Sequence, residues 1–250
     1  MTDIYREISI TTFRSGDDSA NIAALRTLFR ASAWAAFIIL AGMLIHNMNA
    51  LWLEPTYLGF VDKAKDYGDM SKIQNAIESC SMDALQLCSF KYSGFAHMIN
   101  GLLFLFLAVS VQVLLRRSNP LLAQLAFVSG LLAGLGFLIT GISDIPGTVY
   151  ASLLRELNPE HNVAILLMTT MVRGVANIMA ITGLGLFAAF VGRAALKSGV
   201  FSKWGAYYGF VLLLPGIGGL ISPIFGFMYL IFVLPWLVWL GLQFGRLARS

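Results

Sequence analysis

Long stretches without any charged residue are the feature that most constrains how this chain can fold. The longest extends from Trp204 to Gly245, 42 residues without Asp, Glu, Lys or Arg. As one α-helix it would be ~63 Å long, about twice the thickness of a membrane's hydrocarbon core. It therefore predicts two membrane-spanning helices. The helix-breaking segment Ser-Pro-Ile-Phe-Gly at 222–226 is the expected turn between them.

Four further apolar stretches are each long enough to cross a bilayer, for which about 20 residues suffice. The predicted fold is therefore all-α: a single polytopic membrane domain over residues 1–250 with six transmembrane helices. Only 12% of the residues are charged, against about 25% in an ordinary soluble domain. We expect the spans at residues 31–53, 93–115, 120–143, 162–192, 204–222 and 226–245. The segment Ser19–Arg30 is expected to form either a short amphipathic helix or a frayed tail.

The distribution of Lys and Arg predicts the orientation, because cytoplasmic segments of membrane proteins are enriched in both. With the N-terminus inside, the inner segments carry 11 basic and 4 acidic residues, and the outer segments carry 5 basic and 9 acidic residues. Both termini are then expected in the cytoplasm. Residues 1–30 form a cytoplasmic segment, and residues 54–92 form an extracytoplasmic loop between the first two spans.

The outer loop contains both cysteines of the chain, Cys80 and Cys88. Thiols outside the cytoplasm meet an oxidising compartment, and a turn can bring two such Cα atoms within ~6 Å of each other. We therefore predict a Cys80–Cys88 disulfide that closes part of the loop, with two free cysteines as the alternative. The pair is a poor metal site because it has no further Cys and no nearby His.

Arg173 is the only charged residue inside an apolar run. Its guanidinium stays protonated at physiological pH, and burying it in a bilayer costs from about 3 to over 10 kcal/mol. Such residues usually face a partner, a cavity or a ligand. A span of about 20 residues counted back from Arg193 places Arg173 at the outer membrane boundary. Residues 162–172 would then form a helical extension or a partly re-entrant turn. A slanted helix starting at His161 would instead place it nearer the middle.

Polar residues of other expected spans lie at the same outer level. His97 and Asn100 are three residues apart and share one helical face, and Arg173 and Asn177 are four apart and do the same. The predicted ligand-binding set comprises Arg173, His46, Asn47, His97, Asn100, Asp144 and Asn177. The alternative without a ligand is a structural salt bridge between Arg173 and Asp144. The other residues would then only bond neighbouring helices, for about 0.6 kcal/mol each.

Three functions fit these residues. The first is to bind, and by extension to move, a small anionic or lipid-like ligand at an outward-facing intramembrane pocket, since guanidinium pairs well with phosphate and carboxylate. The second is a non-catalytic structural or accessory subunit of a larger membrane complex. The third is a b-type haem protein in which His46 and His97 hold the iron and Arg173 faces a propionate. We expect the first, with membrane lipids around the protein, no resident cofactor and no nucleic-acid partner.

Signatures of enzymes are missing from the sequence. It has no metal-ligand cluster, no Rossmann or P-loop glycine pattern, and no pair of carboxylates inside the spans for acid–base chemistry. We therefore expect a protein without enzymatic activity. The lack of a carboxylate inside the apolar runs also argues against a proton-coupled transporter, because Asp or Glu usually carries such a relay.

The segment Lys197–Gly205, Lys-Ser-Gly-Val-Phe-Ser-Lys-Trp-Gly, is followed by a glycine-rich span. It resembles the junction before the last hairpin in a bacterial family of small multi-span membrane proteins of unknown function. The resemblance covers mainly the third to sixth expected helices, about half of the chain, and excludes the loop with the two cysteines. It implies a six-helix protein of the plasma membrane, here the bacterial inner membrane, and brings no catalytic residues.

Overall fold

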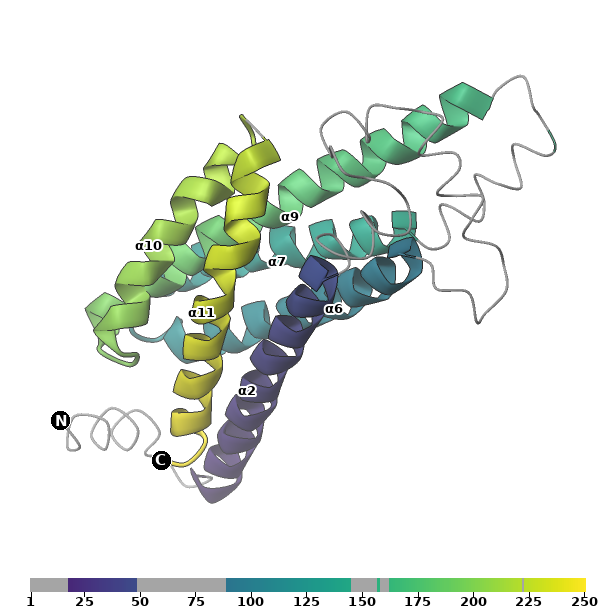
Figure 1. The fold of residues 1–250 in the computed structure, drawn as a ribbon. Coiled ribbons are helices and arrows are strands. Elements are labelled where there is room, and N and C mark those ends of the chain that lie inside the picture. Colours follow the sequence, from purple (N-terminus) through teal and green to yellow (C-terminus); the bar gives the residue numbers. More distant parts are fainter. Residues whose placement is uncertain (1–17, 49–88, 145–156, 158–161, 222) are drawn as a thin grey trace.

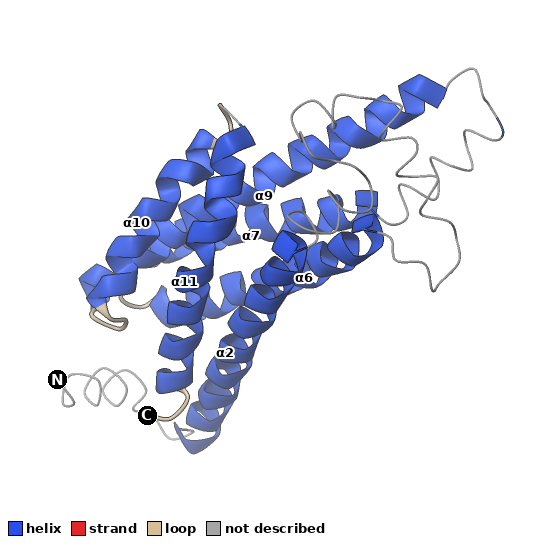
Figure 2. Ribbon diagram, viewed as in Figure 1, coloured by secondary structure: helices blue, strands red, loops and turns tan. Residues whose placement is uncertain are grey.

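The computed structural model describes residues 18–48, 89–144, 157, 162–221 and 223–250, and these form six helices (Figure 1). No strand occurs within the described ranges, where only short turns join successive helices (Figure 2). The all-α prediction is therefore confirmed. The helices are α2 (Asp18–Met48), α6 (Ser89–Leu115), α7 (Pro120–Ile142), α9 (Asn162–Ser198), α10 (Lys203–Gly218) and α11 (Pro223–Leu247).

The six helices form a closed ring. Each packs against its neighbours along the chain, and the last, α11, packs against α2 (Figure 1). One apolar cluster joins all six helices, and its largest members include the fully buried Phe104, Phe187 and Trp236 from α6, α9 and α11. Phe187 and Trp236 meet edge to face, with ring centroids 5.9 Å apart. Side chains therefore fill the centre of the described bundle.

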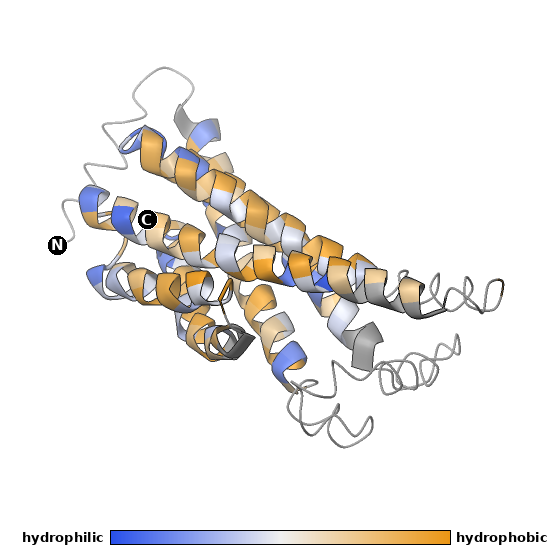
Figure 3. Cartoon of the chain, turned by 90° about the horizontal axis from the view of Figure 1, so that it is seen from above, coloured by the Kyte–Doolittle hydropathy of each residue, from blue (hydrophilic) through white to orange (hydrophobic). Residues whose placement is uncertain are grey.

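Four helices are long and apolar enough to cross a membrane by length and composition, within residues 21–48, 93–115, 120–142 and 171–198. Hydrophobic residues dominate the middle of these helices, and hydrophilic residues gather mainly toward their ends (Figure 3). Of the two C-terminal helices, α10 has 16 residues, and the described apolar segment of α11 covers Ile231–Leu247. These features are those of a membrane protein.

Small residues let α7 and α9 approach closely, as their glycine content predicts. A Cβ atom on Gly136 would collide with the backbone of Ala180, and one on Gly183 would collide with the backbone of Ala133. Both contacts join α7 to α9, so the glycines are required by the closeness of the two backbones. This close packing fixes α9 against the rest of the ring, and α9 carries Arg173.

Some helix ends differ from those expected. The first helix begins at Asp18, so the segment expected as a separate short helix or frayed tail continues directly into the first span. The turn before α11 lies at residues 219–221, before the expected segment 222–226, and α11 starts at Pro223. Proline suits the first position of a helix because the N–H that it lacks would have no partner there.

Helix α9 extends to Ser198, six residues beyond the expected end of the fourth span. It stops at Gly199, whose φ of 67° places it in the left-handed region that glycine favours. The N–H of Gly199 donates to the carbonyl oxygen of Ala195 at 2.9 Å, which closes the last turn. The predicted Cys80–Cys88 disulfide and most of the loop 54–92 lie outside the described residues, so that pairing stays a prediction.

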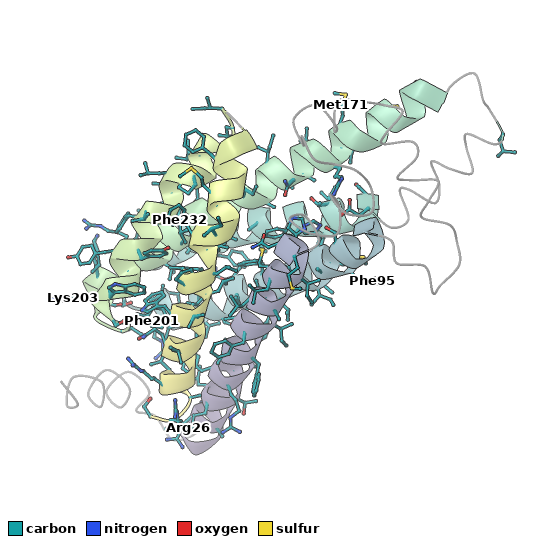
Figure 4. All side chains as sticks on the ribbon, viewed as in Figure 1. Arg26, Phe95, Met171, Phe201, Lys203 and Phe232 are labelled. Carbon is teal, nitrogen blue, oxygen red and sulfur yellow. The ribbon has the colours of Figure 1, made fainter. Side chains whose placement is uncertain are left out.

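Most basic residues gather at one end of the bundle, which we call the basic end. Of the 11 described Lys and Arg residues, nine lie there: Arg26, Arg30, Arg116, Arg117, Arg193, Lys197, Lys203, Arg246 and Arg249. Arg26 donates through Nη2 to the carbonyl oxygen of Ser250 at 3.0 Å, which ties the start of α2 to the end of α11. Figure 4 labels Arg26 and Lys203 at this end and Phe95 and Met171 toward the opposite end.

Candidate functional site

A buried carboxylate joins three helices at the end opposite the basic end. The side chain of Asp144 is 0% exposed. Its Oδ1 lies 2.6 Å from Nε of Arg173 on α9, and its Oδ2 lies 3.1 Å from Nδ1 of His97 on α6. The ion pair between Arg173 and Asp144, which was the alternative without a ligand, is therefore present, and His97 is a second partner of the same carboxylate.

His46, near the end of α2, brings a fourth helix to this network. Its ring lies against that of His97, with centroids 4.6 Å apart and planes inclined by 44°. Its Nδ1 lies 2.9 Å from Oγ of Ser93 on α6. His97 also stacks on Phe137 of α7, with centroids 5.9 Å apart. We call His46, Ser93, His97, Asp144 and Arg173 the charged network.

The charged network lies about one membrane thickness from the basic end. Arg173 precedes Arg193 by 20 residues on α9, and His97 precedes Arg116 by 19 residues at the end of α6. At 1.5 Å per residue these separations are roughly 30 and 28 Å, close to the thickness of the hydrocarbon core. Residues 162–172 continue α9 as a helix beyond this level. The boundary position of Arg173 stays a prediction.

Asp144 is buried because the end of α7 continues past Ile142. Ser143 and Asp144 form a π-helical turn, and the N–H of Ser143 points to the carbonyl oxygens of Ile139 and Thr140. Asp144 is thereby turned inward and is only 1% exposed. Asp144 lies just past the apolar run but is buried, so the argument against proton coupling, which assumed that no carboxylate is buried, was wrong. Sequence spacing placed Asp144 beyond the span, and Arg173 and His97 offset the cost of burying it.

Asn100 lies one turn deeper than His97 on the same face of α6. It is 0% exposed, and neither atom of its amide has a hydrogen-bond partner in the described structure. The amide faces Gly42 of α2, where any Cβ atom would collide with it. An unpaired buried polar group costs about 1–3 kcal/mol. Asn100 therefore belongs to the α2–α6 interface one turn below the charged network, and its amide forms no hydrogen bond with the described residues of that network.

The two other predicted residues lie at the margin of the network. Asn47 is half-buried next to His46 near the end of α2. Asn177 is exposed on α9, between the exposed side chains of Val175 and Ile178. Contacts among the described residues join His46, His97, Asp144 and Arg173 of the predicted set. Sequence reasoning missed Ser93, although its position four residues before His97 places both on one helical face.

Haem does not fit between His46 and His97 in this arrangement. Two axial imidazoles must stand on opposite faces of the macrocycle, whereas these rings lie in contact, with centroids 4.6 Å apart. Insertion of a porphyrin would require α2 and α6 to separate.

The charged network is electrically balanced when both histidines are neutral, because Arg173 and Asp144 carry opposite charges. The two partners differ in exposure: Asp144 is fully buried, whereas 22% of the Arg173 side chain is exposed. Arg173 thus lies between the buried carboxylate and the surroundings. Geometrically, the network can present a guanidinium to an approaching group and hold a proton on an imidazole.

Comparison of the chain with protein-family models, curated proteins and solved structures found no match. The resemblance of the segment Lys197–Gly205 to a bacterial membrane family stays a prediction. The functional argument therefore depends on the geometry of the charged network.

Proposed function

We propose that this protein binds a small anionic or lipid-like ligand at an outward-facing site around Arg173, and that movement of the ligand is a further step of the same function. The observation that carries the proposal is the unequal exposure of the ion pair, with Asp144 at 0% and Arg173 at 22%. An anion approaching from outside would meet the guanidinium before the carboxylate. Guanidinium pairs with carboxylate or phosphate through two parallel N–H donors, which gives both strength and orientation.

The proposal includes a membrane topology. We propose six crossings, both termini in the cytoplasm, a Cys80–Cys88 disulfide in the outer loop, and residence in the plasma membrane as a bacterial inner-membrane protein. The gathering of nine described basic residues at one end of the bundle supports this orientation, because such residues favour the cytoplasmic side. The charged network then lies on the outer side of the membrane.

The test compares two arginines of the same helix. We would measure binding of dihexanoyl phosphatidylglycerol and of acetate to the purified full-length protein by titration calorimetry. Arg173→Gln should weaken binding at least tenfold, because it removes the charged donor. Arg193→Gln, which changes an exposed arginine at the basic end of α9, should leave binding unchanged. Arg173→Lys keeps the charge without the fork of donors and should bind with intermediate affinity.

Unchanged binding by a folded Arg173→Gln variant would refute the proposed site. The phosphatidylglycerol and acetate measurements also distinguish the two ligand sources. Preference for the phosphodiester indicates a lipid headgroup, and preference for acetate indicates a free carboxylate.

One observation favours the second candidate, an accessory subunit of a membrane complex. Asn177 is exposed on α9 beside Val175, which is 66% exposed, and Ile178, which is 39% exposed. An amide on a lipid-facing surface favours contact with another helix. A stable partner that co-purifies in mild detergent and is lost in Asn177→Leu would support this function. A lone protomer with bound anion would support the first.

A further inference from the structure

We propose that anion binding at Arg173 is coupled to the uptake of one proton by His97, so that the site takes up an anion and a proton together. This inference rests on the proposed function and specifies its chemistry. It follows from the charges of the network and from the contacts that His97 makes.

The first step is the balance of charge. Without a ligand, Arg173 and Asp144 neutralise each other across the contact between Nε and Oδ1. A bound anion would add one negative charge next to a carboxylate that is fully buried. An uncompensated charge in such surroundings is strongly disfavoured. One added positive charge within the network restores the balance.

His97 is the residue placed to carry that charge. Its Nδ1 lies 3.1 Å from Oδ2 of Asp144, the carboxylate oxygen that does not contact Arg173. With Nδ1–H donating to Asp144, Nε2 is the nitrogen that accepts a proton, and the resulting imidazolium keeps its donor on the carboxylate. His97 then compensates Asp144, and the charge of Arg173 is offset by the bound anion. No large movement is needed, because the contact between His97 and Asp144 already exists.

The neighbours of His97 set the number of protons. His97 contacts the ring of His46 from α2 and the carboxylate of Asp144 at the end of α7, and Arg173 from α9 contacts the same carboxylate. The rings of His46 and His97 lie 4.6 Å apart, so two imidazolium ions there would repel each other strongly. The pair therefore takes up one proton. One proton compensates one negative charge, which predicts a singly charged oxyanion, either a carboxylate or a phosphodiester.

The experiment counts protons as the anion binds. Purified full-length protein is titrated with acetate and, separately, with dihexanoyl phosphatidylglycerol, in pairs of buffers with different heats of ionisation. Neither anion changes its charge between about pH 6 and 8. We expect about one proton taken up per bound anion near pH 7.5. Uptake of one proton per anion should make the Kd rise roughly tenfold per pH unit.

Two variants should abolish proton uptake with opposite effects on affinity. In His97→Gln the amide can still donate to Asp144 but cannot take up a proton, so binding should be weak and independent of pH. In Asp144→Asn the charge that needs compensation is gone, so binding should be tight and independent of pH. Arg193→Gln, at the basic end of α9, is the control and should keep uptake of one proton.

The outcomes separate this inference from the proposed function. Binding without proton uptake, and with a Kd that does not change with pH, would overturn the coupling and leave the anion site standing. No binding of either anion at any pH from 6 to 8 would overturn both. Uptake of one proton retained in His97→Gln would also overturn the inference, because the inference assigns the proton to His97.

Discussion

Removal of either partner of the buried ion pair should destabilise the protein, but by unequal amounts. Loss of one member of a buried pair costs about 3–5 kcal/mol, because the other charge is left without compensation. Asp144→Asn leaves a guanidinium that is 22% exposed near the membrane boundary. This guanidinium can turn toward the lipid headgroups, so we expect the free energy of unfolding to fall by about 3 kcal/mol. Arg173→Gln leaves the Asp144 carboxylate fully buried, with His97 as its remaining partner in the network. We therefore expect the free energy of unfolding to fall by about 5 kcal/mol.

The double variant Asp144→Asn/Arg173→Gln removes both charges together. Its two neutral amides leave no uncompensated charge in the protein. The free energy of unfolding should therefore fall by at least about 2 kcal/mol less than the sum of the two single losses. Arg193→Gln is the control on the same helix, and its exposed side chain at the basic end should make its effect small.

The assay is equilibrium unfolding of the full-length protein in mixed micelles with increasing dodecyl sulfate, followed by the fluorescence of its five tryptophans. It is run near pH 7.5 without added anion. Equal losses for the two single variants would contradict the inferred difference in exposure. A double variant whose loss equals the sum of the single losses would show that the two charges do not interact, and the reasoning would be refuted.

Two further predictions concern the interface between α2 and α6 and use the same unfolding assay. Gly42→Ala should destabilise the protein by about 1–3 kcal/mol, because the added methyl collides with the buried amide of Asn100. Gly174→Ala on α9, where nothing lies within 4 Å of the added Cβ atom, is the control and should be neutral or stabilising by up to about 1 kcal/mol. If Gly174→Ala were the less stable of the two variants, the packing around Gly42 would be contradicted. Asn100→Leu should raise stability by about 1–3 kcal/mol, because it removes an unpaired buried amide without changing the side chain's shape much. A loss of stability would instead show that the amide is bonded in the ligand-free protein.

The helices were predictable from the sequence because the bilayer demands long apolar segments and the chain supplies them. The partner of Arg173 was predictable for a related reason. A charge near a membrane requires compensation, and Asp144 was the acidic residue expected closest to the membrane depth of Arg173. In both cases a strong physical requirement left few alternatives.

Other features depended on details that composition and spacing do not encode. Asp144 is buried in a π-helical turn that follows α7, and the apolar pattern of the sequence does not predict this turn. The contact between His46 and His97 results from the packing of α2 against α6. Asn177 lies four residues from Arg173, but on a helix this separation still rotates the side chain by about 40°. That rotation leaves Asn177 on the exposed surface, while the longer side chain of Arg173 reaches inward to Asp144.

The central claim is that Arg173 holds a group from outside in addition to Asp144. A density map at about pH 6 tests it directly, with the protein in nanodiscs that contain phosphatidylglycerol and, in a second sample, with acetate added. The account predicts density for an oxyanion within about 3 Å of a guanidinium nitrogen of Arg173 in at least one sample. A well-resolved guanidinium surrounded only by Asp144 and other protein groups in both samples would contradict it.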